Sequence, residues 1–143
     1  MAPHFFTEPA GLKSIAEARH AYDNDDLRER LAKYHNNVDM AFLGWNEAWL
    51  DPGFESWNIA DCIDHWRVPV LAIQGRDDQY GTLAQIEEIN ARCPAPVEVA
   101  ILDDCQHAPH LQQPQTTLAA ISDFIKTLSA MEGFDKSLNN NRA

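Results

Sequence analysis

Apolar residues recur at helical spacing in the first part of the chain. The helices we expect lie near residues 11–22, 27–34 and 38–49, followed by short helical turns over 54–66. Asp51-Pro52-Gly53 ends the third helix, because proline cannot continue the hydrogen-bond ladder. The N-terminal His4-Phe5-Phe6 fits either a strand or loop tucked into the core or a chain that begins within a fold. The pattern therefore predicts a mainly helical region before the first strand.

The second part of the chain changes to a strand, helix, strand, helix order. Val68–Gln74 is an apolar run without polar alternation, as in a strand buried on both faces of a parallel sheet. Thr82 and Gln85 form the pattern of a capping box, which opens a helix that ends at Cys93. The remaining elements are a strand over 97–102 and a helix from Pro114 through Met131, with Gly133 as its C′ residue. This order predicts a right-handed βαβ unit with parallel strands.

We therefore place the chain in the α/β class. It divides into a helical region, a β-α-β-α unit and a frayed tail, over residues 1–66, 67–133 and 134–143. The last helix has an apolar face formed by Leu118, Ile121, Phe124, Ile125 and Leu128. Two parallel strands leave open edges, and a sheet this small rarely stands alone. We therefore expect uncovered apolar faces and a homo-oligomer.

Composition removes several classes of function. The chain has 143 residues, 45% of them hydrophobic, and a net charge of −11. The charge argues against nucleic-acid binding, which needs a basic patch, and against attraction to an anionic membrane. The three cysteines suggest neither a disulfide framework nor a zinc spacing, and no signal peptide or membrane-spanning run is evident. We expect a cytoplasmic protein without a cofactor, acting on a small molecule.

The four tryptophans lie close together in the sequence, before the first strand. Our first interpretation is that most of them belong to the core. The alternative is that some of them, Trp45 and Trp49 above all, line an apolar pocket, since binding sites favour aromatic walls.

Polar side chains follow each predicted strand at the point where it ends. Asp77 and Asp78 follow the first strand, and His107 and His110 follow the second. Two strand ends that carry an acid and then a histidine suggest part of a catalytic triad. A metal site is a weaker alternative, because Pro109 keeps the two histidines off one helical face; its ligands would come from Asp77, Asp78, Asp103, Asp104, Cys105, His107 and His110. A Cys105 nucleophile is weaker still, because a side chain two positions from His107 usually points elsewhere.

These segments resemble the C-terminal part of an α/β-hydrolase, in Pro69-Val-Leu-Ala-Ile-Gln-Gly-Arg-Asp-Asp78 and Asp104-Cys-Gln-His-Ala-Pro-His110. In that family the acid follows a late strand in a Gly-x-x-Asp turn, and the histidine follows the last strand. The resemblance implies that Asp78 is the acid, with Asp77 as the fallback, and that His107 is the base. Residues 1–66 would then be the cap of a partial α/β-hydrolase fold. Trp45, Trp49 and His110 are the candidate substrate-binding residues.

The sequence departs from the family in two places. Gln106 stands where a glycine usually precedes the histidine, and no Gly-x-Ser-x-Gly nucleophile elbow is present. The chain therefore resembles the second half of a longer serine hydrolase that acts on an ester or related carbonyl compound. We expect it to be inactive alone. The alternative is a non-catalytic, oligomeric module for binding or assembly.

Overall fold

The computed structural model describes the backbone of residues 1–140 and the side chains of residues 1–130. At its centre lies a two-stranded parallel sheet of β1 (Val70–Gly75) and β2 (Val97–Leu102). Helix α4 (Ala84–Arg92) connects the two strands. Parallel strands need such a crossover, because the second strand must start at the same end as the first. The predicted α/β class and the parallel pairing are confirmed.

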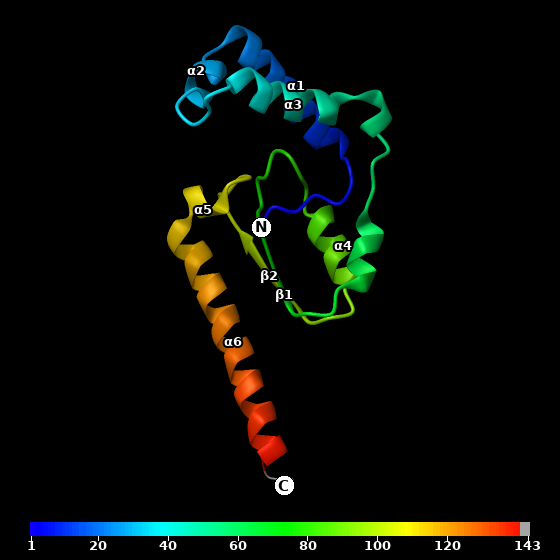
Figure 1. Ribbon diagram of the computed structural model, residues 1–143, viewed down its shortest axis with the longest axis vertical. Coiled ribbons are helices and arrows are strands. Elements are labelled where there is room, and N and C mark those ends of the chain that lie inside the picture. Colours follow the sequence, from blue (N-terminus) through cyan, green and yellow to red (C-terminus); the bar gives the residue numbers. More distant parts are fainter. Residues whose placement is uncertain (141–143) are drawn as a thin grey trace.

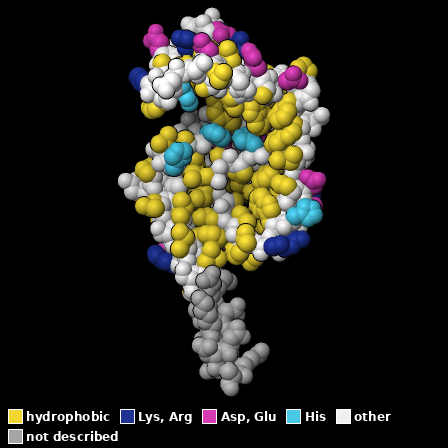
Figure 2. All heavy atoms as spheres, viewed as in Figure 1, with side chains coloured by type: hydrophobic (Ala, Val, Ile, Leu, Met, Phe, Trp, Pro, Cys, Tyr) yellow, Lys and Arg dark blue, Asp and Glu magenta, His cyan; other side chains and the backbone are white. Residues whose placement is uncertain are grey.

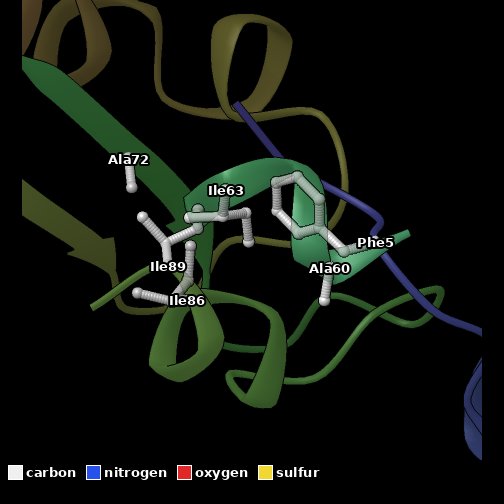
Figure 3. Packing of buried hydrophobic residues seen from close by; sticks show 6 residues of the cluster. All are labelled: Phe5, Ala60, Ile63, Ala72, Ile86 and Ile89. Atoms are coloured by element: carbon white, nitrogen blue, oxygen red, sulfur yellow. The ribbon is translucent and has the colours of Figure 1, made fainter. Parts of the chain in front are cut away.

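The sheet is covered on both faces (Figure 1). Consecutive residues of a strand point to opposite faces of the sheet. Ala72 of β1 therefore packs on one face, and Ile73 packs on the other. On one side, α4 and the short helix η2 (Ala60–His65) complete an apolar cluster that Figure 3 shows from close by. Its buried members are Phe5, Ala60, Ile63, Ala72, Ile86 and Ile89. On the other side, α6 (Pro114–Asn140) packs against the sheet through Ala120 and Ile121.

The N-terminal segment is tucked into the core, as the first of our two interpretations held. Phe5 is buried in the α4 cluster, and Phe6 forms an antiparallel bridge with Asn58. The Ala2 N–H also donates to the Ile73 carbonyl oxygen at 2.8 Å, which brings this segment to the free edge of β1.

Three helices form a layer above the loops that follow the strands (Figure 1). We call this layer, α1 (Pro9–Asn24), α2 (Leu27–Leu31) and α3 (Val38–Leu50), the helical cap. Asn37 begins α3 by accepting a hydrogen bond from the Met40 N–H, and η1 (Pro52–Phe54) follows it. The cap comes very close to the first strand loop, since a Cβ at Gly11 would lie 2.1 Å from the Tyr80 carbonyl oxygen.

The predicted capping box at Thr82 and Gln85 is wrong. The Gln85 side chain does not return to the Thr82 amide. It is fully buried and binds the N-terminal segment, accepting from the Phe5 N–H at 2.8 Å and donating to the Phe6 carbonyl oxygen at 3.0 Å. Glu8 instead accepts the Thr82 N–H, at 3.0 Å. A long-range partner thus replaces the local one, because the buried peptide groups of the N-terminal segment need partners.

The C-terminal helix is longer than the sequence pattern indicated. α6 continues through Asn140, past Gly133, where we expected its end. An interior glycine costs a helix only about 1 kcal/mol relative to alanine, so it does not stop a helix by itself. Of the tail that we expected to be frayed, residues 141–143 lie outside the described residues. A short helix, α5 (Pro109–Gln112), was not predicted.

Two other expectations concern apolar residues. None of the four tryptophans is buried, so our first interpretation of them as core residues is wrong. On α6, Leu118 and Ile125 belong to the predicted apolar face, yet they are 63% and 55% exposed. The helix reaches beyond the small sheet that it covers. Within the described residues, no helix is both long and apolar enough to cross a membrane.

Candidate active site

The loops that follow β1 and β2 lie directly against each other. A Cβ at Gly75 would lie 2.1 Å from the Cys105 carbonyl oxygen, so only glycine fits at this end of β1. The Asp77 N–H donates to the same carbonyl oxygen at 2.9 Å. Asp104 turns the second loop with a φ of 52°, a left-handed conformation that aspartate adopts more readily than most residues. This backbone contact brings the side chains of the two loops within reach of each other.

Asp78 and His107 meet at this junction. The Nδ1 atom of His107 lies 3.0 Å from both carboxylate oxygens of Asp78. The Asp78 side chain is 1% exposed and that of His107 is 37% exposed. A carboxylate only accepts hydrogen bonds, so Nδ1 carries the proton and, in the neutral ring, Nε2 is left as a proton acceptor. The acid is thus buried, while the imidazole remains open to a reactant.

Asp78 is held as a carboxylate by its neighbours. Burial raises the pKa of this carboxyl group, but the hydrogen bond from His107 and the backbone N–H groups of Tyr80 and Gly81 lower it more. The Tyr80 and Gly81 amides donate to Oδ1 at 2.9 and 3.3 Å. The net pKa lies below its ordinary value, so Asp78 is ionised at neutral pH.

His107 opens onto a pocket of about 220 Å³ between the strand loops and the helical cap. The pocket is lined by His4, Ile15, Trp45, Trp49, Tyr80 and His107. The Tyr80 ring packs edge to face on His107, with centroids 5.0 Å apart. Figure 2 shows histidine and hydrophobic side chains gathered around a notch between the cap and the body below. Trp45 and Trp49 therefore lie where the pocket interpretation put them.

His4 belongs to this pocket, although the sequence did not single it out. Its ring centroid lies 5.7 Å from that of His107 and 5.5 Å from that of Trp49. Burial and the repulsion from His107 lower the pKa of His4, which favours its neutral form. No sequence signal marks His4, because it reaches the site only through the folding of the N-terminal segment. Tyr80, in contrast, follows the acid by two positions and could have been inferred.

The other candidate residues of the two loops do not line the pocket. Asp77 is exposed and touches the second loop only through its backbone. His110 is exposed on α5, because the buried Pro109 turns the next side chain outward, and it does not line the pocket. Cys105 is buried beside Ile73, and burial raises the pKa of its thiol, so it is no thiolate nucleophile.

Among the residues that the structure describes, the pocket has neither a nucleophilic side chain nor a cluster of metal ligands. No serine, threonine or cysteine lines it. No three histidine, cysteine, aspartate or glutamate side chains gather in a way that could hold a metal ion. Asp103, one of the possible ligands that we considered, instead pairs with Arg76. The site thus contains an imidazole paired with a carboxylate, and no hydroxyl or thiol side chain is among the described lining residues.

Comparison with known proteins identifies the fold. A curated protein, the pimeloyl-[acyl-carrier protein] methyl ester esterase of Aromatoleum aromaticum, is 30% identical over 115 residues. The match covers 80% of this chain and 44% of that protein. No protein-family profile matches the chain.

Solved structures of esterases show the same fold over part of their length. An esterase from a Rhodococcus species matches with a TM-score of 0.52 and 15% identity, over 83% of this chain and 48% of that one. An esterase from Exiguobacterium antarcticum matches with a TM-score of 0.53 and 10% identity, over 85% and 53%. The chain thus spans about half the length of the proteins it matches. It has a partial α/β-hydrolase fold, as its resemblance to that family implied.

Proposed function

We propose that this chain supplies the acid, the base and the substrate pocket of a serine-hydrolase-type esterase. The observation that carries the proposal is the contact between buried Asp78 and half-exposed His107 at the ends of adjacent parallel strands. Ligands in open α/β sheets bind at this end of the strands. The similarity to esterases favours an ester as substrate, although the match covers only part of each.

The roles of the two residues follow from their geometry. As a nucleophilic hydroxyl attacks the ester carbonyl carbon, His107 Nε2 takes the hydroxyl proton. The resulting imidazolium is stabilised by Asp78, which also fixes the ring through Nδ1. When the C–O bond breaks, the same proton passes to the leaving alkoxide. Water then repeats the sequence on the acyl intermediate and releases the acid.

The nucleophile is the part that the described pocket lacks. We propose that a nucleophile elbow from outside this chain completes the reaction, and that the chain alone does not turn over an ester. It needs no cofactor under this proposal. Its three cysteines are free, in keeping with our proposal of a cytoplasmic, reducing setting.

The test joins this chain to the part of the Aromatoleum esterase that lies outside the matched segment. The isolated chain should leave a chromogenic short-chain ester intact, whereas the joined protein should hydrolyse it. His107→Ala should abolish that activity and His110→Ala should preserve it, since His110 lies outside the pocket. If the joined protein folds cooperatively and its activity is the same with and without His107, the proposal fails. Activity of the isolated chain that His107→Ala abolishes would refute the missing nucleophile.

A second candidate is a non-catalytic module that associates with copies of itself. The exposed apolar residues of α6, Leu118 and Ile125, favour it. The outer edge of β2, which pairs with no further strand among the described residues, favours it as well. We propose a homo-oligomer under either candidate, since a hydrolase part can also self-associate.

A further inference from the structure

A second pocket, which we call the cap pocket, lies between the cap helices and the loop that carries Asp78. It measures about 260 Å³ and is lined by Ala18, Leu27, Leu31, His35, Ala41, Phe42, Trp45 and Tyr80. Most of these side chains are apolar, and they come from α1, α2, α3 and the loop of the acid. Cavities with such walls bind apolar parts of ligands. Nothing in the proposed acid–base chemistry uses this space.

The cap pocket and the His107 pocket share two walls, Trp45 and Tyr80. The two rings meet edge to face, with centroids 6.1 Å apart. Tyr80 also packs on the His107 ring. The two pockets therefore share one aromatic pair, and Tyr80 of that pair is in direct contact with the proposed base.

Phe42, which lines the cap pocket beside Trp45, is held in place by its neighbours. Phe42 stacks on Tyr22, with ring centroids 4.0 Å apart and an interplanar angle of 2°. The Tyr22 hydroxyl donates to Asp39 at 2.6 Å, and Arg28 donates to the same carboxylate. These bonds join α1, α2 and α3 around the cap pocket. A preformed cavity lowers the cost of ordering on binding.

We propose that the two pockets form one site for an ester with an unbranched apolar acyl chain. This inference rests on the proposed function. The ester carbonyl lies at His107, the chain passes the Trp45–Tyr80 pair, and its end reaches the cap pocket near His35. Each methylene group that enters the cap pocket leaves water and should tighten binding by about fourfold. The proposal names a substrate class, medium-chain acyl esters, for the same acid–base site.

Histidines mark both ends of the proposed site, which allows a direct test on the chain as it exists. The titration uses methyl esters of saturated acids, from methyl butyrate to methyl decanoate, and follows the side-chain nitrogen resonances of the six histidines by NMR. Methyl butyrate should perturb His107 and leave His35 unchanged. The longer esters should perturb both, with affinity rising as the chain lengthens. The exposed His110 serves as an internal control.

A matched pair of variants on α3 tests the cap pocket itself. Ala41 and Ala48 are both exposed, but only Ala41 is among the residues that line the cap pocket. Ala41→Phe should fill that pocket and weaken methyl decanoate to the affinity of methyl butyrate. Ala48→Phe should bind both esters as the unchanged protein does. Because both changes lie at exposed positions of one helix, neither should prevent folding.

The outcomes separate this inference from the function on which it rests. Perturbation of His107 without His35 at every chain length would overturn the extended site and leave the proposed function standing. Equal binding by Ala41→Phe and Ala48→Phe would also overturn the extended site. If none of the esters perturbs His107, both the inference and the proposed ester site fail.

Discussion

His107 places its Nδ1 atom 3.0 Å from both oxygens of the Asp78 carboxylate, although the two residues lie 29 positions apart in the chain. The contact depends on backbone packing more than on either side chain. Strands β1 and β2 end side by side at Gly75 and Leu102, and the loops beyond them touch through the Cys105 carbonyl oxygen. Asp78 is therefore fixed by the strand that precedes it, and His107 by the neighbouring strand.

The close approach of the loops predicts that Gly75→Ala is severely destabilising. A Cβ there would overlap the Cys105 and Gln106 carbonyl oxygens, at 2.1 and 2.2 Å, and backbone must move to relieve the overlap. We expect a loss of about 3 kcal/mol in the free energy of unfolding, measured with urea. The control is Gly44→Ala, in α3, where a Cβ meets nothing within 4 Å. It should stabilise by about 0.5–1 kcal/mol. Equal effects of the two changes would contradict the packing described for Gly75.

Much of the fold could be predicted from the sequence. The crossover helix and the three cap helices follow from hydrophobic periodicity, and the first parallel strand follows from an apolar run without polar alternation, as in a sheet covered on both faces. The strand order could place Asp77, Asp78, His107 and His110 at one edge, because the carboxyl ends of parallel strands meet there. The choice of Asp78 and His107 among them came from the resemblance to the α/β-hydrolase family.

The predictions that were wrong or incomplete share a physical cause, which is contact between segments far apart in the chain. Gln85 fits a local capping box by spacing, but buried peptide groups of the N-terminal segment take its side chain. His4 enters the pocket from that same segment, and no local pattern reports it. Trp45 and Trp49 could be grouped as aromatic, but their burial depends on what lies opposite them. Local spacing cannot supply that information.

The role of Gln85 predicts a long-range defect from a single change. Gln85→Ala leaves the buried Phe5 N–H without its partner at 2.8 Å and frees the segment that carries His4. We expect a loss of about 1–3 kcal/mol in the free energy of unfolding. Glu87→Ala, on the exposed side of the same helix, should change it by less than about 0.5 kcal/mol. If urea unfolding gives the two variants the same stability, Gln85 does not anchor the N-terminal segment.

The lowered pKa of Asp78 predicts acid sensitivity. Between that pKa and the unfolded value of about 3.9, the unfolded chain binds more protons than the folded one, so stability rises with pH there. The contribution of Asp78 should be complete above about pH 5 and be lost as pH falls through the folded-state pKa. Urea unfolding of the unchanged protein and of Asp78→Asn should therefore differ at pH 6 and converge in acid. The exposed Asp77→Asn should show no such convergence. A constant difference for Asp78→Asn would contradict the assigned ionisation.

The exposed apolar residues of α6 predict self-association. Sedimentation at micromolar concentration should give a mass above that of a monomer. Leu118→Lys combined with Ile125→Lys should shift the protein toward monomer, because both side chains are more than half exposed and apolar. Gln115→Lys with Thr127→Lys adds the same charge at exposed polar positions of the helix and should leave the mass unchanged. A monomer mass for the unchanged protein would contradict the proposed homo-oligomer.

The most direct test of the acid–base assignment is the position of the proton on His107. Nitrogen NMR of the imidazole, recorded where the ring is neutral, distinguishes a proton on Nδ1 from one on Nε2. The contact with Asp78 predicts that the proton lies on Nδ1 and that Nε2 is free to accept one. Asp78→Asn should reduce that preference, whereas Asp77→Asn should preserve it. A neutral His107 that carries its proton mainly on Nε2 would contradict the proposed role of the pair.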